Sequence, residues 1–177
     1  MTQLSKNSTQ IEQAIRVNHA GEYGAKQIYQ GQLAVFKIKK DQETVNLISH
    51  MKEQEDVHFD YFDKKIIAEK IRPTIMQPLW KIAGFALGAT TALMGKKAAM
   101  ACTVAVEEVI DEHYQEQLRN LEEKGDLKEK IEQFRQEELE HRDIGLENHA
   151  EDLSIYKPLS FIIKKASKLA ITISTKI

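Results

Sequence analysis

Two glutamates in the chain are each followed three residues later by a histidine, as Glu55-x-x-His58 and as Glu138-x-x-His141. Residues i and i+3 share one face of an α-helix, so each pair could hold one metal ion. One such pair is weak evidence, because glutamate is common on helices. A four-helix bundle that binds two metal ions carries this pattern on two helices, with a lone glutamate from each of the other two. The two pairs therefore direct attention to glutamates elsewhere in the chain.

Glu22 and Glu107 are the candidates for these lone glutamates, because both stand in line with apolar residues. Ile15 and Tyr29 lie seven positions before and after Glu22, and Met100 lies seven positions before Glu107. The glutamates of the two pairs lie on similar stripes, so all four should point into the core. A buried carboxylate without a partner costs several kcal/mol, whereas two Fe²⁺ ions would neutralise four of them. The predicted ligand set is Glu22, Glu55, His58, Glu107, Glu138 and His141.

These residues follow one another in a repeated order. Glu55 comes 33 residues after Glu22, and Glu138 comes 31 residues after Glu107. Two similar helix hairpins would bring the ligands together around a pseudo-twofold axis. The repeat makes this set a stronger signal than either pair alone.

Several neighbours of these ligands have roles that the spacing leaves open. Tyr114 lies seven positions after Glu107 and should approach the site, where it could gate substrate, shuttle electrons or simply fill the core. His113 lies off that face, so an outer or surface role is favoured over ligation. Asn18 and Asp143 could orient ligands through hydrogen bonds.

The elements that must position the ligands are helices. The chain has only 3 Pro and 8 Gly, and apolar residues recur every three to four positions. Helices are expected at about 9–38, 42–70, 97–123 and 127–148, which predicts an all-α, ferritin-like four-helix bundle. One domain should span residues 1–177, with about 1–10 flexible.

Two further segments fall outside the four expected helices. Residues 74–96 are apolar on most sides and rich in Gly and Ala, and residues 158–175 have the pattern of a basic amphipathic helix. The longest apolar run, 82–95, is too short to span a bilayer, which takes about 20 residues. Both segments could cover the bundle core or lie on a membrane surface.

Composition narrows the classes of function. The net charge of −2 gives no electrostatic case for nucleic-acid binding, and the single cysteine, Cys102, excludes an internal disulfide or a cysteine-rich metal site. The first ten residues lack the apolar stretch of a signal peptide.

Longer motifs resemble those of the demethoxyubiquinone hydroxylase family of ubiquinone biosynthesis. The resemblance covers about residues 11–175, and two positions depart from it: Asn18 stands where aspartate is common, and Arg142 where a second histidine is common. The motifs are Arg16-Val-Asn-His-Ala-Gly-Glu22-Tyr-Gly-Ala, Arg72-Pro-Thr, Pro78-Leu-Trp80, Gly84-Phe-Ala-Leu-Gly88, Ala99-Met-Ala-Cys-Thr-Val-Ala-Val-Glu107-Glu, and Glu137-Glu-Leu-Glu-His141 with Asp143-Ile-Gly145.

This resemblance implies the same six ligands, and it favours Glu107 over its neighbour Glu108. It implies a di-iron monooxygenase that uses O₂ to hydroxylate the ring of a demethoxyubiquinol, with NADH or the quinol itself as reductant. A ferritin-like ferroxidase or iron-binding protein is the alternative, since it would use the same ligands. Manganese would also suit such a site.

The implied substrate carries a polyprenyl tail and lies in the bilayer, which suggests a function for the segment 74–96. With Trp80 and Phe85, this segment is suited to the membrane interface, and the helix after Pro158 could assist. We expect a peripheral protein on the cytoplasmic face of a bacterial inner membrane, or on the matrix face of the mitochondrial inner membrane. A homo-oligomer and a lipid-binding partner protein of ubiquinone biosynthesis are further expectations.

Overall fold

The computed structural model describes the backbone of residues 3–121 and 125–177, and the side chains from residue 9 onward within these ranges. Helices account for nearly all of it, and no strand occurs in the described part of the chain, so the predicted all-α class is confirmed. The elements are α1 (Gln3–Lys39), α2 (Gln42–Ala68), α3 (Gln77–Leu93), α4 (Lys96–Asn120), α5 (Asp126–Glu147), η1 (Ala150–Asp152) and α6 (Tyr156–Lys176).

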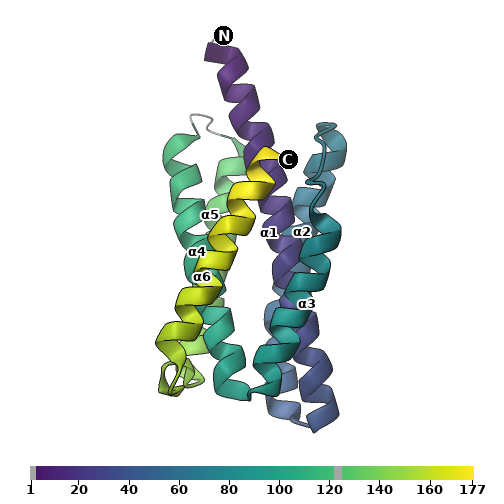
Figure 1. Ribbon diagram of the computed structural model, residues 1–177. Coiled ribbons are helices and arrows are strands. Elements are labelled where there is room, and N and C mark those ends of the chain that lie inside the picture. Colours follow the sequence, from purple (N-terminus) through teal and green to yellow (C-terminus); the bar gives the residue numbers. More distant parts are fainter. Residues whose placement is uncertain (1–2, 122–124) are drawn as a thin grey trace.

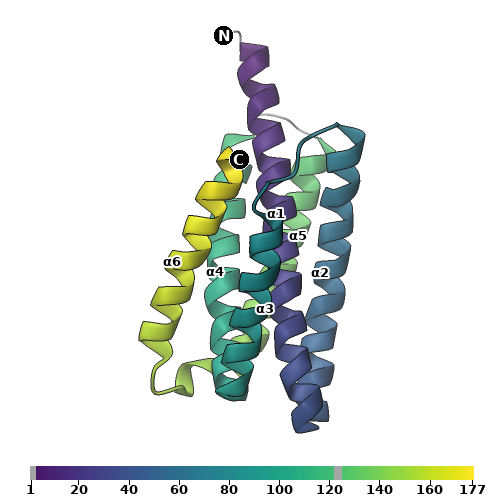
Figure 2. The ribbon, with the colours of Figure 1, turned by 45° about the vertical axis from the view of Figure 1, so that its right-hand side comes forward.

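The bundle is built from two helix hairpins, α1–α2 and α4–α5, that lie against each other (Figure 1). The two remaining long helices run along one side of this bundle (Figure 2): α3 packs mainly on α1, and α6 on α4 and α1. The expected segment 74–96 is thus the helix α3, and the expected tail 158–175 is α6.

Helix limits differ slightly from those expected. The helix α1 begins at Gln3, so residues 3–8 extend it beyond the expected start at 9. The helix α2 stops at Ala68, two residues before its expected end, and the chain then turns through Lys70 with a φ of 53°. The end of the third expected helix, at 123, falls on residues 122–124, which lie outside the described residues.

Glycines let α3 approach α1 closely. A Cβ on Gly88 would overlap the carbonyl oxygen of Ile28, and a Cβ on Gly31 would overlap that of Phe85. Only glycine permits this backbone approach. The resulting contact buries one face of α3 and leaves its other face exposed. None of the described helices is long and apolar enough to cross a membrane.

Two apolar clusters occupy the interior of the bundle at different levels. One contains Phe36, Ile48, Met51 and Met100, and the other contains Ile15, Phe62, Ile131 and Phe134. Buried residues of α1, α2 and α4 contribute to both clusters. The helix α5 contributes Ile131 and Phe134 to the second cluster, and its partly buried Ile144 packs against the first. The predicted ligands lie between the clusters, shielded from water above and below.

Candidate metal centre

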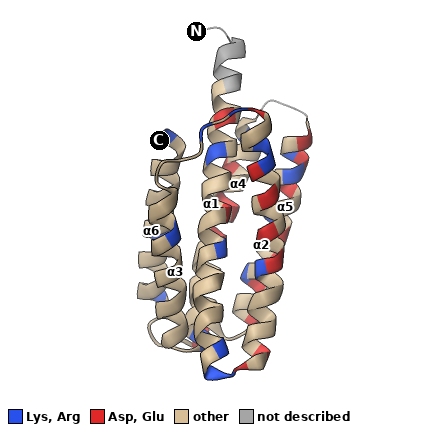
Figure 3. Ribbon diagram, turned by 90° about the vertical axis from the view of Figure 1, so that its right-hand side faces the viewer, with Lys and Arg blue, Asp and Glu red and all other residues tan. Residues whose placement is uncertain are grey.

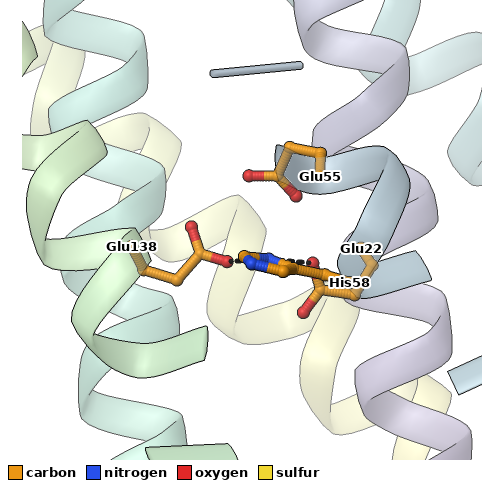
Figure 4. Close-up of side chains that lie close together, drawn as sticks. All are labelled: Glu22, Glu55, His58 and Glu138. Atoms are coloured by element: carbon orange, nitrogen blue, oxygen red, sulfur yellow. Dashed lines mark hydrogen bonds and ion pairs between the residues drawn. The ribbon is translucent and has the colours of Figure 1, made fainter. Parts of the chain in front are cut away.

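All six predicted ligands converge in the bundle interior, and each side chain is at most 1% exposed. They form two overlapping groups in which one ligand atom per residue lies within 4.8 Å of the others. Figure 4 shows the first group, in which Glu22, Glu55 and His58 approach Glu138 from the opposite side of the bundle. The groups are Glu22, Glu55, His58 and Glu138, and Glu55, Glu107, Glu138 and His141.

Glu138 joins the two groups. Its Oε1 lies 3.1 Å from Nδ1 of His58, and its Oε2 lies 3.2 Å from Nδ1 of His141. Around it, Glu55 Oε1 is 3.2 Å from Nδ1 of His141, and Glu22 Oε2 is 3.5 Å from Nδ1 of His58. With one oxygen toward each group, Glu138 would help to hold both metal ions, and so would Glu55, which also belongs to both groups. These two are termed the bridging glutamates.

The buried oxygens of this cluster fit a metal better than they fit each other. Oε2 of Glu22, both oxygens of Glu55 and Oε2 of Glu107 receive no well-aligned hydrogen bond from any described residue. Such atoms are costly in a protein interior unless a cation or a donor satisfies them. Two divalent ions would balance the four carboxylates, and the two imidazoles would complete a mixed oxygen and nitrogen donor set.

The pKa values show the competition for positive charge in the absence of a metal. Burial lowers the pKa of both histidines, but hydrogen bonds and charges of the glutamates outweigh it and raise the pKa to about 12 for His58 and about 11 for His141. Burial, followed by the charge of Glu138, raises the pKa of Glu55 and of Glu107. Burial opposes ionisation of Glu138 too, but the two histidines lower its pKa. Protons thus occupy the place that cations would take, and metal binding would release them.

Two tyrosines cross-link the lone glutamates. The hydroxyl of Tyr29 on α1 donates to Glu107 on α4 at 2.8 Å, and the hydroxyl of Tyr114 on α4 donates to Glu22 on α1. Burial, followed by the charges of the glutamates, raises both tyrosine pKa values, so both remain donors. The approach expected of Tyr114 is observed. The role of Tyr29 was missed, although it has the same seven-residue spacing from Glu22.

Each histidine has a further partner outside the cluster. Nε2 of His141 lies 2.8 Å from Oε1 of Gln54, and Nε2 of His58 contacts Oε2 of Glu137. Both acceptors are oxygens, so each Nε2 is a hydrogen-bond donor and each Nδ1 faces the cluster. Neither partner was predicted. Each one directly precedes a bridging glutamate in the sequence, a signal that could have been used.

The other residues considered from the sequence lie farther out. Asn18 and Gln117 exchange two hydrogen bonds of 2.8 and 2.9 Å, and Gln117 also lies 2.8 Å from His113. Asp143 is exposed and pairs with its neighbour Arg142, so it orients no ligand. Glu108 pairs with Lys164 of α6, which leaves Glu107 as the inward residue of the two.

An apolar cavity of about 180 Å³ lies between α1, α3, α4 and α6. Among the six clustered residues only Glu22 lines it, next to Tyr114, so the cavity meets the centre on the side of the first group. Its remaining walls are mainly small or aliphatic side chains, such as Leu87 and Ile171, together with the aromatic Trp80. A planar organic molecule could lie there with its ring beside the centre and its apolar part toward α3 and α6.

Known proteins are similar in sequence to this chain over most of its length. The model of the family described as "Ubiquinone biosynthesis protein COQ7" matches residues 9–174. The chain is 50% identical over 171 residues, 94% of its length, to the "NADPH-dependent 3-demethoxyubiquinone 3-hydroxylase, mitochondrial" of Dictyostelium discoideum, of which it covers 77%. It is also 50% identical over 171 residues to the "3-demethoxyubiquinol 3-hydroxylase" of Rhodospirillum rubrum, covering 94% of the chain and 78% of that protein. A human relative, which has the same name as the Dictyostelium protein, is 45% identical over 94% of the chain and 78% of its own length.

Proposed function

Because the chain belongs to the COQ7 family of ubiquinone biosynthesis proteins, we propose that it hydroxylates the ring of a demethoxyubiquinol with O₂. The observation that carries this proposal is the double carboxylate and histidine cluster at the inner end of an apolar cavity. Insertion of one oxygen atom into a ring C–H bond consumes O₂, two electrons and two protons and releases water. A dinuclear metal centre next to a ring-sized cavity suits this reaction.

We propose iron as the metal, held by Glu22, Glu55 and His58 with Glu138 on one side and by Glu107 and His141 with both bridging glutamates on the other. Two reduced iron ions, when bound, supply electrons to O₂. The chain's own residues fix the ions, and the apolar clusters above and below keep water away. The hydroxyls of Tyr29 and Tyr114 hold the lone glutamates in place.

The names of the relatives support a proposal for the electron source. The Dictyostelium and human proteins are called NADPH-dependent, so we propose a reduced nicotinamide nucleotide as the reductant of this chain as well. The quinol itself is the alternative.

We propose that the outer faces of α3 and α6 lie on a membrane, from which the substrate enters the cavity. Apolar side chains gather on these faces: Ile75, Leu79, Ile82, Phe85, Leu93 and Met94 on or beside α3, and Phe161, Ile162 and Leu169 on α6. An amphipathic surface of this kind binds the headgroup region of a bilayer. Trp80 is half-buried, and its Nε1 donates to Ser174 Oγ at 2.9 Å, which links α3 to α6.

The test is anaerobic reconstitution with Fe²⁺, followed by addition of O₂, reduced nicotinamide nucleotide and a short-chain demethoxyubiquinol. Two irons per chain and a hydroxylated ring are expected, with both lost in Glu55→Ala. Rapid iron oxidation with mineral growth and no ring product would instead assign the protein to the ferroxidases.

A further inference from the structure

The two metal groups are built as near copies of one another. On each side a tyrosine from the opposite hairpin donates to the lone glutamate, and a histidine presents Nδ1 to the bridging Glu138. On each side, too, Nε2 of the histidine bonds to the residue that precedes a bridging glutamate. One chemical difference between the copies is the charge of that last residue.

His58 is backed by the carboxylate of Glu137, whereas His141 is backed by the neutral amide of Gln54. Glu137 is held in place, because Gln133 Nε2 donates to its other oxygen at 2.9 Å. Its side chain is 25% exposed, so solvent weakens its charge without removing it. Gln54 is also partly buried, which makes the two positions comparable in environment.

A carboxylate that accepts the outer N–H of a metal-binding imidazole makes the ring a stronger donor, and it adds a negative charge behind the cation. An amide oxygen provides the hydrogen bond without the charge. Outer partners of this kind change metal affinity by about 10–100-fold. The two sites should therefore differ in affinity by about this factor.

We propose that Glu137 is a positioning residue that makes the two metal sites unequal: the ion on His58 binds first and more tightly, and the ion on His141 is the exchangeable one. This inference rests on the proposed dinuclear centre. The structure also relates the two sites to the substrate cavity. Glu22, the ligand that lines the apolar cavity, belongs to the His58 group. The tightly held ion is thus the one beside the substrate cavity.

Anaerobic calorimetric titration with Co²⁺, without substrate or O₂, measures this directly. The wild type should bind two ions in two resolved steps. Glu137→Gln should weaken the first step by about 10–100-fold and merge it with the second, and Gln54→Glu should strengthen the second step by a similar factor. Glu140→Gln, an exposed change on the same helix as Glu137, is the matched control and should leave both steps unaltered.

The double variant Gln54→Glu/Glu137→Gln exchanges the two partners and so identifies the sites. At one equivalent of Co²⁺, the paramagnetically shifted ring N–H signal in the NMR spectrum should belong to His58 in the wild type and to His141 in the double variant. A first step that Glu137→Gln leaves unchanged, or an N–H signal that does not move, overturns the inference while two ions still bind. Failure of the wild type to bind two ions would instead overturn the proposed centre itself.

Discussion

The interior of the bundle and its α3–α6 flank use opposite chemistry. The interior buries four glutamates and two histidines at no more than 1% exposure, whereas the flank exposes Ile82, at 69%, and other large apolar side chains. Figure 3 shows the same contrast in charge: α3 and α6 carry few charged residues on this side, while Asp, Glu, Lys and Arg gather on α2 and α5. Each region has an unfavourable free energy without a partner: the interior because it buries charge, and the flank because it exposes apolar surface to water.

A binding partner would stabilise each of the two regions. Buried carboxylates without donors call for cations, and an exposed apolar surface calls for a lipid or another apolar surface. The cavity beside Glu22 connects the two regions, because α3 and α6 form its outer walls. Metal binding would depend on the buried ligands and membrane binding on the exposed apolar side chains. Because these are different residues, changes in one region should leave the property of the other intact, and four experiments test this separation.

The largest effect is expected from Glu138→Ala, because Glu138 faces both histidines. Each ion loses a ligand, so we expect the affinity for both to fall by well over about 100-fold, more than the loss of an outer partner causes. Metal analysis after reconstitution and the rate of ring hydroxylation measure the effect.

Liposome binding of Glu138→Ala should equal that of the wild type, since the change is far from the flank. Glu140→Ala, an exposed position on the same helix, is the control for metal content. Two ions per chain in Glu138→Ala would contradict the bridging role.

The second experiment reverses the comparison by placing charge on the flank. Ile82→Glu together with Phe85→Glu removes two exposed apolar side chains from α3. We expect the loss of about 3 kcal/mol of transfer free energy, or roughly a hundredfold in liposome affinity, measured by flotation.

Ile67→Glu is the matched control, because Ile67 is 70% exposed but lies on α2. It should leave liposome binding unaltered. Flank variants that float as well as the wild type would exclude α3 from the membrane contact, and a loss of bound metal would show that the regions are not separable.

Sequence reasoning reached further in the interior than on the flank. Helical periodicity within one element is enough to place Glu55 and His58 on one face, and the repeat of the hairpins is enough to pair them with Glu138 and His141. The partners that cross between helices, such as Tyr29 with Glu107, depend on how two helices are rotated and shifted against each other. Periodicity in one helix does not contain that information.

The flank shows the same limit more strongly. A segment that is apolar on most sides could cover a core or face a membrane, and α3 does bury one face on α1 through Gly31 and Gly88. Only the structure separates its buried face from its exposed one. It also shows that Trp80, expected at the membrane interface, ties α3 to α6.

The third experiment tests this attachment of the flank. In Gly88→Ala the new methyl group would overlap the backbone of Ile28, which forces α3 away from α1. We expect a loss of about 2 kcal/mol in the free energy of unfolding, measured in urea, with both metal ions still bound.

Gly24→Ala is the control, because a Cβ there meets no heavy atom within 4 Å. Its stability should rise by up to about 1 kcal/mol through the better helix propensity of alanine. Equal stabilities for the two variants would show that α3 is not packed as tightly as described.

The smallest effect at neutral pH concerns His113, which lies where the two regions meet, on the wall of the apolar cavity and beside Tyr114. Burial lowers the pKa of His113 to about 4, against the residual pull of Glu116. The neutral ring accepts a hydrogen bond from Gln117 Nε2, which protonation would remove. The unfolded chain binds a proton near pH 6.5, so the stability from neutral His113 is complete above that pH and is lost as the pH falls toward 4.

His113→Gln should therefore flatten the pH dependence of the free energy of unfolding between pH 6.5 and 4. The difference from the wild type should be about 1 kcal/mol per pH unit at most, since one proton sets a limit near 1.4 kcal/mol per unit. His50→Gln, at an exposed position on α2, should leave the wild-type profile intact. If His113→Gln kept the full acid sensitivity, titratable groups other than His113 would govern it.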